Sequence, residues 1–318
     1  MNRLFTSKQA FQIKDIPDLT GKLAVITGAS NGIGKVSALE MARKNCNIVF
    51  ACRNREKTEA VIGDIKKETK NDNLEFLEID MSSLSSVKRF VSEFSTKYDK
   101  VDILLNNGGV MMAPTPYSKD GIDYQFAVNH VAHHYLTMSL LPLLQRSPSS
   151  RVVNVASEMH RYTSKLGLDN INTDEHAGKI QSYGISKVAN ILFTRELAKR
   201  LKEQGIENVY VNCNHPGTVS TDIFRPGLET GPFISKFVTS IVVNYFTVTP
   251  EKGALTQLYL CTSPEVEEND IRAQYYVPVA KSGSPTKLAS SDKEALLLWE
   301  FTENLLKEKI PGYSGANI

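Results

Sequence analysis

Long apolar segments, closely spaced cysteines and an excess of charge of one sign are all lacking from this sequence. No apolar run reaches the roughly 18 residues that a membrane-spanning helix needs, and residues 1–20 lack the apolar core of a secretory signal. The 37 basic and 35 acidic side chains leave a net charge of +2, which gives no reason to expect a nucleic acid partner. We therefore expect a cytoplasmic globular protein, and a peripheral position on the endoplasmic reticulum membrane or on lipid droplets stays open.

The cysteine and histidine spacings do not indicate a metal or redox site. The chain has 4 cysteines, and no two of them form a C-x-x-C pair. Most lie in or beside apolar runs, so we expect core thiols in a reducing compartment. A cluster of histidines has no other converging ligands in the sequence, so we interpret these as core or surface residues and predict no metal. The cysteines are Cys46, Cys52, Cys213 and Cys261, and the clustered histidines are His130, His133 and His134.

Short apolar runs alternate with helix-like segments along most of the chain. Such repeated βα units predict a parallel sheet covered by helices on both faces. We therefore predict an α/β fold, with a single doubly wound domain of about seven strands. We place an N-terminal extension at 1–20, the dinucleotide-binding catalytic domain at 21–285 and a C-terminal helical extension at 286–318. The expected strands are 22–27, 47–51, 74–79, 101–105, 151–155, 209–213 and 275–279, and the expected helices are 32–44, 56–70, one capped by Ser82 or Ser83, 121–144 and 181–202.

One segment departs from this alternation. Residues 217–250 are rich in glycine and proline and contain an apolar run at 233–248. Because ligands of doubly wound folds bind at the carboxyl ends of the strands, we expect this excursion to overhang the site as a lid or substrate wall. A membrane-surface segment and a buried helix are the alternatives for 233–248. The first two readings both favour a lipophilic substrate.

A glycine-rich turn joins the first expected strand to the first expected helix. Glycine lets the backbone approach phosphates closely, and the start of a helix favours negative charge. Strand, turn and helix in this order are the context that a dinucleotide-binding motif requires. The alternative is an ordinary strand-to-helix turn. The candidate cofactor-binding residues in this turn are Gly28, Ser30, Asn31, Gly32, Ile33 and Gly34.

The residues after the second strand favour NADP over NAD. NAD enzymes usually place an acidic side chain there to hold the ribose hydroxyls, whereas this chain has Arg53. A carboxylate would repel a 2′-phosphate, and an arginine fork binds one. A solvated surface charge is the alternative for Arg53. Asp80 and Met81 follow the third strand, and Asn107 and Gly108 follow the fourth, where either cofactor contact or turn chemistry explains them.

Tyr183 and Lys187 are four residues apart on an expected helix, so their side chains share one face. An ammonium beside a phenol stabilises the phenolate, and we expect it to lower the pKa of Tyr183. The pair then predicts a group that donates and accepts protons near neutral pH. A buried tyrosine with a satisfied hydroxyl, next to a surface lysine, is the alternative.

Several of these segments together resemble the short-chain dehydrogenase/reductase family over about residues 21–279. The match is closest to the branch of retinol dehydrogenases and WW-domain oxidoreductases. The resemblance implies a Rossmann-type fold. Two positions depart from the family pattern: Gly108 stands where alanine is usual, and Ala156 stands where this branch often has serine. The resemblance rests on residues 27–34, Ala51-Cys52-Arg53, Asn106-Asn107-Gly108-Gly109 and the Val110-Met111-Met112 that follows, Val128-Asn129-His130, Ser157, the Tyr183 and Lys187 pair, and His215-Pro216-Gly217-Thr218-Val219.

The resemblance also implies roles for the matching residues. Tyr183 would be the general acid in carbonyl reduction and the base in alcohol oxidation. Lys187 would hold the nicotinamide ribose, and Ser157 would orient the substrate oxygen and stabilise charge on it. Asn129 would hold a water molecule that links Lys187 to solvent. The residues expected to flank the nicotinamide and its carboxamide are Pro216, Gly217, Thr218 and Val219.

These observations predict an NADP-dependent oxidoreductase that interconverts a carbonyl and an alcohol on a lipophilic small molecule. Retinoids, steroids or long-chain aldehydes are candidates through the resemblance only, which suggests a place in lipid metabolism. A nucleotide-binding scaffold without turnover is the alternative from another class of protein. Peripheral membrane contact through residues 233–248, a homodimer and NAD in place of NADP stay open.

Overall fold

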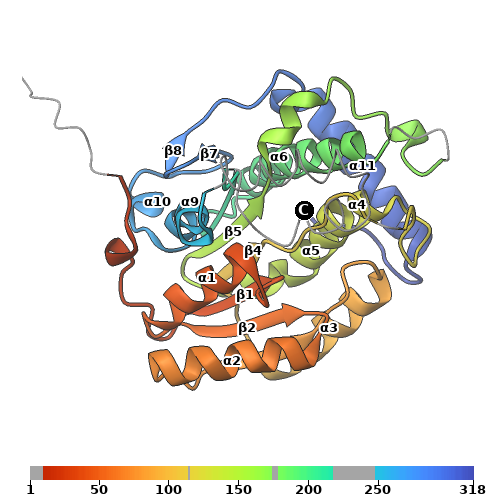
Figure 1. Ribbon diagram of the computed structural model, residues 1–318. Helices are drawn as coiled ribbons and strands as arrows, with labels where there is room; N and C mark the ends of the chain where they lie inside the picture. The colour runs from red at the N-terminus through yellow and green to blue at the C-terminus, as the bar shows by residue number, and fades with distance from the viewer. Residues whose placement is uncertain (1–9, 114, 174–177, 218–247) are drawn as a thin grey trace, which may run out of the picture.

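The computed structural model describes residues 10–113, 115–173, 178–217 and 248–318 (Figure 1). Within these residues one sheet of eight strands has the order β3-β2-β1-β4-β5-β6-β7-β8. The first seven strands are parallel, and the short β8 is antiparallel to β7. This confirms the predicted doubly wound α/β fold and adds an eighth strand that the sequence did not indicate. The strands are β1 (Leu23–Thr27), β2 (Asn47–Cys52), β3 (Leu74–Glu78), β4 (Ile103–Asn106), β5 (Ser150–Val155), β6 (Val209–Asn214), β7 (Tyr275–Val277) and β8 (Lys281–Ser282).

Helices cover both faces of the sheet, and each face has its own apolar core. Side chains of β1 alternate between the two cores: Val25 belongs to one, and Ala24 and Ile26 belong to the other. Helices α3, α5, α6 and α11 line the first core, and α1, α2 and α9 line the second. The helices are α1 (Gly32–Ala42), α2 (Arg55–Thr69), α3 (Leu84–Lys97), α4 (Tyr124–Phe126), α5 (Ala132–Leu144), α6 (Lys179–Glu203), α9 (Pro250–Thr262), α10 (Glu265–Glu268) and α11 (Asp292–Lys309), with a π-helical turn η2 (Ala127–Val131) and 3-10 turns η1 (Ile13–Asp15), η3 (Glu158–Tyr162), η4 (Leu168–Asn170) and η6 (Leu288–Ser290).

The helix predicted after Ser82 or Ser83 is α3, and local sequence features determine where it begins and which face is buried. Ser83 is its N-cap, because its side chain accepts a hydrogen bond of 3.4 Å from Ser86 N. Val87, Phe90 and Phe94 then recur on one face and are buried in the core. The helix predicted at about 121–144 is confirmed at 124–144: it starts at Tyr124, ends at Leu144 and includes the π-helical turn η2, which the sequence did not indicate.

Helix α11, drawn in blue, packs along α6 (Figure 1). Its Leu298, Trp299 and Leu306 belong to the same core as α5 and α6. The guanidinium of Arg200 on α6 lies 4.4 Å from the ring centroid of Trp299, which is a cation–π contact. The C-terminal helix is therefore part of the packed core, while the domain boundaries at 20 and 285 stay predictions.

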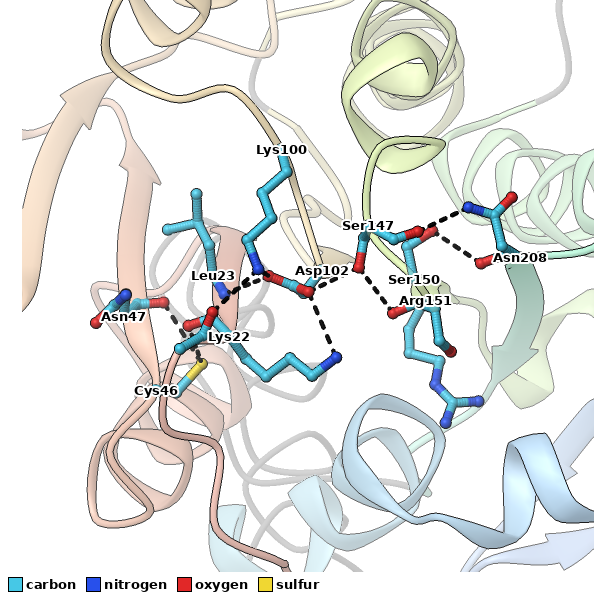
Figure 2. A network of polar contacts seen from close by, with 12 residues as sticks. Lys22, Leu23, Cys46, Asn47, Lys100, Asp102, Ser147, Ser150, Arg151 and Asn208 are labelled. Carbon is cyan, nitrogen blue, oxygen red and sulfur yellow. Dashed lines mark hydrogen bonds and ion pairs between the residues drawn. The ribbon is translucent and has the colours of Figure 1, made fainter.

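A network of charged and polar groups holds the amino-terminal edge of the sheet (Figure 2). The buried carboxylate of Asp102 accepts hydrogen bonds from Leu23 N at 2.9 Å and from Ser147 Oγ at 2.7 Å. The ammonium groups of Lys100 and Lys22 lie 2.9 Å and 3.4 Å from its two oxygens. Because these residues lie just before or at the start of β1, β4 and β5, the network is at the opposite edge of the sheet from the predicted site.

The carboxyl-terminal edge carries the predicted site, because Gly28, Arg53, Asn107, Ser157 and Pro216 each follow the end of a strand. The order of strands reverses between β1 and β4, which is where doubly wound folds bind dinucleotides. Cys46, Cys52 and Cys213 are buried, which confirms them as core thiols, and Cys261 is buried as well. Of the helices that the structure describes, none combines the length and apolarity needed to cross a bilayer.

Candidate active site

The glycine-rich turn between β1 and α1 needs glycine at specific positions. Gly28 and Gly32 have φ angles of 66° and 54°, in the left-handed region that favours glycine. A Cβ atom on Gly34 would lie 2.5 Å from Asn107 Nδ2 and 2.6 Å from Gly28 O. The turn is therefore closed against the loop after β4, and the first amides of α1 are left at the strand end to face an anion.

Asn107 fastens the loop after β4 to this turn. Its Nδ2 donates to Thr27 O at 2.9 Å and to Gly28 O at 3.3 Å. The backbone amides of Asn107 and Gly108 donate to Thr27 Oγ1 at 2.9 Å and 2.8 Å. A Cβ atom at Gly108 would come within 3.3 Å of Thr27 Oγ1, so the glycine that replaces the usual alanine relieves a tight contact here.

Basic groups gather where the adenosine end of a dinucleotide would bind. Arg53 is exposed directly after β2. Lys119 Nζ lies 2.8 Å from Asp80 Oδ2, while Ser82 N donates to Asp80 Oδ1 at 3.0 Å. Burial raises the pKa of Asp80, but the hydrogen bonds from Lys119 and Ser82 outweigh it and lower the pKa overall. Lys119 is close enough to Arg53 for repulsion between their charges, and the sequence did not single it out.

The turn after β5 brings Ser157 to Tyr183. Ser157 caps the 3-10 turn η3, its Oγ accepts from Met159 N at 3.2 Å, and it is close enough to Tyr183 to lower the pKa of the phenol. A Cβ atom on Gly184 would lie 2.4 Å from Thr163 Oγ1 and 3.1 Å from Met159 O. Glycine next to Tyr183 therefore allows η3 to pack closely on α6, which brings Ser157 near Tyr183.

Tyr183 and Lys187 are both buried on α6, and Lys187 Nζ lies 5.5 Å from the Tyr183 ring centroid. Burial raises the pKa of Tyr183 to about 12, and the hydrogen bond from Ser157 offsets only part of this. Burial also lowers the pKa of Lys187 to about 8. The predicted lowering of the Tyr183 pKa is therefore wrong for the groups that this chain supplies, because desolvation of the phenol by burial is the largest effect on it. Tyr183 is a protonated acid at neutral pH.

Asn129 lies in the π-helical turn η2, a distortion that is frequent at functional sites. Its Oδ1 accepts from Val110 N at 2.8 Å, and its Nδ2 donates to Val110 O at 2.9 Å and to Ser186 Oγ at 3.0 Å. Both amide protons are thus used within the protein, and Oδ1 keeps one lone pair. A Cβ atom on Gly109 would lie 3.2 Å from Asn129 Oδ1 and 3.6 Å from Lys187 Nζ, so the three residues adjoin.

The structure places Pro216 and Gly217 after β6, where Gly217 N donates to His215 Nδ1 at 3.0 Å and Gly217 has a φ of 83°. Thr218 and Val219 lie outside the described residues, as does the apolar run at 233–247. Met81 is half-buried beside the core. Ser30, Asn31 and Ile33 complete the turn into α1. Among the described residues, no group of three metal-ligating side chains comes together.

Sequence reasoning missed Asn190 and Thr27. Asn190 Nδ2 donates to Val155 O at 3.1 Å, the same carbonyl that accepts from Lys187 Nζ at 3.0 Å. Its position three residues after Lys187 was the available signal, since such residues share a helix face. Thr27 is the first residue of the glycine-rich segment 27–34. No pattern in the sequence indicated that its hydroxyl accepts hydrogen bonds from two backbone amides.

Comparisons with known proteins show the family and the fold of this chain. The chain matches the family model described as short chain dehydrogenase over residues 22–230. Human retinol dehydrogenase 14 is 35% identical over 296 residues, which cover 89% of this chain and 85% of the relative. Human polyprenol dehydrogenase is 34% identical over 255 residues, which cover 79% and 76%. The crystal structure of an uncharacterized protein from Mycobacterium paratuberculosis has a TM-score of 0.73 and 28% identity, covering 94% of this chain and 98% of that one.

Proposed function

Because this chain belongs to the short-chain dehydrogenase family, we propose that it is an NADP-dependent enzyme that interconverts a carbonyl and an alcohol on a lipophilic small molecule. Family membership makes it an oxidoreductase of the class that uses NAD or NADP. The observation that carries the proposal is the burial of Tyr183 and Lys187 side by side on α6, with Lys187 Nζ 5.5 Å from the Tyr183 ring centroid and Ser157 close by. Protein side chains cannot supply a hydride. A nicotinamide dinucleotide bound at the glycine-rich turn would supply it.

The proton chemistry follows from the protonation states of these groups. When bound, the nicotinamide supplies the hydride for reduction or accepts it in oxidation. The Tyr183 hydroxyl, protonated at neutral pH, donates its proton to the substrate oxygen as the hydride reaches the carbon. The Ser157 hydroxyl hydrogen-bonds to the same oxygen and stabilises its developing negative charge. Lys187, which is mostly charged below pH 8, stabilises the phenolate that remains.

The preference for NADP is supported by the charges after β2 and β3. Arg53 is exposed directly after β2, where it could turn toward a 2′-phosphate, and Lys119 lies nearby with its ammonium paired to Asp80 at 2.8 Å. No acidic residue occupies the strand end at 52–55. An isolated 2′-phosphate contact of this kind contributes about 1.5–3 kcal/mol, or roughly tenfold to a hundredfold in affinity.

Arg53→Ala tests this preference, with Arg55→Ala as its control. The Arg55 guanidinium lies over the Phe76 ring at 4.5 Å and pairs with Glu59 at 2.9 Å, so it is already engaged. We expect Arg53→Ala to raise KM for NADPH at least about tenfold and to leave KM for NADH unchanged. Arg55→Ala should leave both constants unchanged. A wild-type KM that is lower for NADH than for NADPH would replace NADP by NAD in the proposal, and equal KM values would remove the preference.

A lipophilic substrate is supported by an open cavity at the start of α6. Its volume is about 470 Å³, and it is lined in part by Met112, Tyr162 and Ile180. Tyr162 and Ile180 are 77% and 56% exposed, which is unusual for large apolar side chains. Tyr183 follows Ile180 within one turn of the same helix. The names of the two human relatives refer to retinol and polyprenol, both apolar alcohols.

Tyr183→Phe tests the reaction itself. Purified protein with NADPH and a panel of apolar aldehydes and ketones should oxidise NADPH, and the variant should lose a factor of about 100 to 10,000 in kcat. Tyr259→Phe is a matched control, because Tyr259 is buried in α9 and its hydroxyl contacts Glu265. Full turnover by Tyr183→Phe would refute the assignment. Nucleotide binding without turnover on any panel member would favour the scaffold alternative.

A further inference from the structure

His133 on α5 contacts both halves of the candidate site. Its Nε2 lies 2.9 Å from Thr27 Oγ1, at the end of β1. Its Nδ1 lies 3.1 Å from Asn129 O, in the π-helical turn. The ring is buried, so both contacts are shielded from water. His133 therefore links Thr27, at the start of the glycine-rich turn, to Asn129, which the resemblance assigns to the proton path.

The hydrogen-bond partners fix the tautomer of His133. A carbonyl oxygen can only accept, so Nδ1 carries the proton and donates it to Asn129 O. Burial lowers the pKa of His133 to about 4, and the charge of Lys187 adds to this, so the ring is neutral and Nε2 is an acceptor at neutral pH. The Thr27 hydroxyl must then donate to Nε2. Its other contact, to Leu105 O, is longer at 3.4 Å.

This donation orients the remaining lone pairs of Thr27 Oγ1. They accept from the amides of Asn107 and Gly108 at 2.9 Å and 2.8 Å. The loop after β4 is thereby held against Gly28, whose added Cβ would lie only 2.8 Å from Gly108 Cα. His133 sets the direction of a hydroxyl that no other described side chain would orient in the same way.

The neighbouring histidines do not share this arrangement. His130 Nε2 contacts Thr302 Oγ1 at 3.2 Å, and His134 Nε2 contacts Glu303 Oε1 at 2.7 Å, both on α11. Within the described residues, the Nδ1 atoms of these two rings are buried without a hydrogen-bond partner. Only His133 of the three uses both ring nitrogens, and it directs them to the site rather than to the C-terminal helix.

We propose that His133 is a positioning residue that couples the nucleotide cradle to Asn129. It touches neither the reacting atoms nor the expected cofactor position and acts through Thr27 and Asn129. The inference rests on the proposed function in that the cradle binds a nicotinamide dinucleotide. Removing the Nε2 acceptor frees the Thr27 hydroxyl to turn, which loosens the Asn107 and Gly108 amides.

The test compares His133→Phe with His133→Gln and His130→Phe. Phenylalanine removes both hydrogen bonds, whereas the glutamine amide oxygen reaches the place of Nε2 and keeps the acceptor for Thr27. His130→Phe removes an equally buried ring on the preceding turn that contacts α11 instead. Each protein is characterised by its melting temperature, by calorimetric affinity for NADPH and NADH, and by KM and kcat with an apolar carbonyl substrate.

We expect His133→Phe to weaken nucleotide affinity about tenfold and to leave KM for the carbonyl substrate within about twofold of wild type. His133→Gln should recover nucleotide affinity to within about threefold. His130→Phe should lower the melting temperature without changing nucleotide affinity. A purely structural role is shown instead, and the proposal overturned, if both phenylalanine variants weaken nucleotide binding equally or if glutamine behaves as phenylalanine does.

Thr27→Val and Thr27→Ser provide a second route if His133→Phe does not fold. Valine removes the hydroxyl without changing the side-chain volume much, and serine keeps it. We expect valine alone to weaken nucleotide affinity about tenfold; the proposal fails if serine and valine bind alike. Because affinity is measured calorimetrically, a wild type that binds nucleotide but turns over no substrate would contradict the proposed function and still test His133.

Discussion

The ammonium of Lys187 donates a hydrogen bond of 3.0 Å to the carbonyl oxygen of Val155, the last residue of β5. Ser157 follows two residues later, so this bond joins α6, which carries Tyr183, to the end of β5, which leads into Ser157. The same burial that protects the bond lowers the pKa of Lys187 to about 8. The charge of this group therefore changes close to neutral pH.

This pKa predicts a pH profile for the reductive reaction. The value of kcat/KM reports the free enzyme, so it should fall as pH rises through about 8, where Lys187 loses its proton. Tyr183 does not contribute to this fall, because its pKa is about 12. Lys187→Arg should lower the plateau and move the fall to higher pH, since a guanidinium stays charged. A wild-type profile that is flat from about pH 6 to about pH 10 would contradict the assignment of charge to Lys187.

Gly34→Ala and Gly63→Ala form a matched pair of glycine substitutions. A Cβ atom on Gly34 would lie 2.6 Å from Gly28 O, so alanine should displace the turn and weaken nucleotide affinity at least about tenfold. A Cβ atom on Gly63, inside α2, meets nothing within 4 Å, so alanine there should raise the free energy of unfolding by about 0.5–1 kcal/mol. Calorimetric titration and chemical denaturation measure both effects. Undiminished nucleotide binding by Gly34→Ala would show that the turn does not form the cradle.

Periodicity and turn chemistry in the sequence were enough to predict the doubly wound sheet. Strands such as β2 are short, apolar and bounded by turn residues, so each local signal agrees with the global fold. Ser83 could be recognised as a cap because capping depends on neighbours within four residues. The glycine turn and the pair of Tyr183 and Lys187 were identified for the same reason, since their spacing along the chain already determines their geometry.

The remaining features depend on contacts between segments distant in sequence. The π-helical turn around Asn129 is stabilised by Val110 and Ser186, which no local pattern connects. The raised pKa of Tyr183 follows from the depth of its burial, which spacing does not reveal. His133 was interpreted as a core or surface histidine, and its core position is confirmed. Its bond to Thr27, 106 positions away, could not be inferred without the fold.

Acid should destabilise the protein through His133. The pKa of this ring is lowered from 6.5 to about 4, so the folded state resists protonation that the unfolded chain accepts. The stability that depends on a neutral ring is complete above pH 6.5 and is lost as pH falls toward 4, a loss of about 3 kcal/mol. His133→Gln removes this titration, so its free energy of unfolding should fall less than that of the wild type over the same pH range. Chemical denaturation at several pH values would measure the two slopes, and parallel slopes would contradict the expectation.

Asp102→Asn should separate stability from catalysis. Burial raises the pKa of Asp102, but hydrogen bonds from Ser147, Lys100 and Leu23 outweigh it and lower the pKa overall. Its contribution to stability is therefore present at neutral pH and is lost only as strong acid protonates it. We expect Asp102→Asn to cost about 2–3 kcal/mol at pH 7, because the asparagine amide places a donor where the carboxylate accepted.

Asp99→Asn is the control for this substitution, because Asp99 is exposed on the loop just before Asp102. We expect Asp99→Asn to change the free energy of unfolding by less than about 0.5 kcal/mol. The Asp102 network lies at the amino-terminal edge of the sheet (Figure 2). The candidate site lies at the carboxyl-terminal edge. At a temperature where both variants stay folded, their KM for NADPH and their kcat should therefore equal the wild-type values. A selective loss of nucleotide affinity in Asp102→Asn would mean that a change at the amino-terminal edge of the sheet alters the site at the carboxyl-terminal edge. That result would contradict the expectation that the Asp102 network affects stability alone.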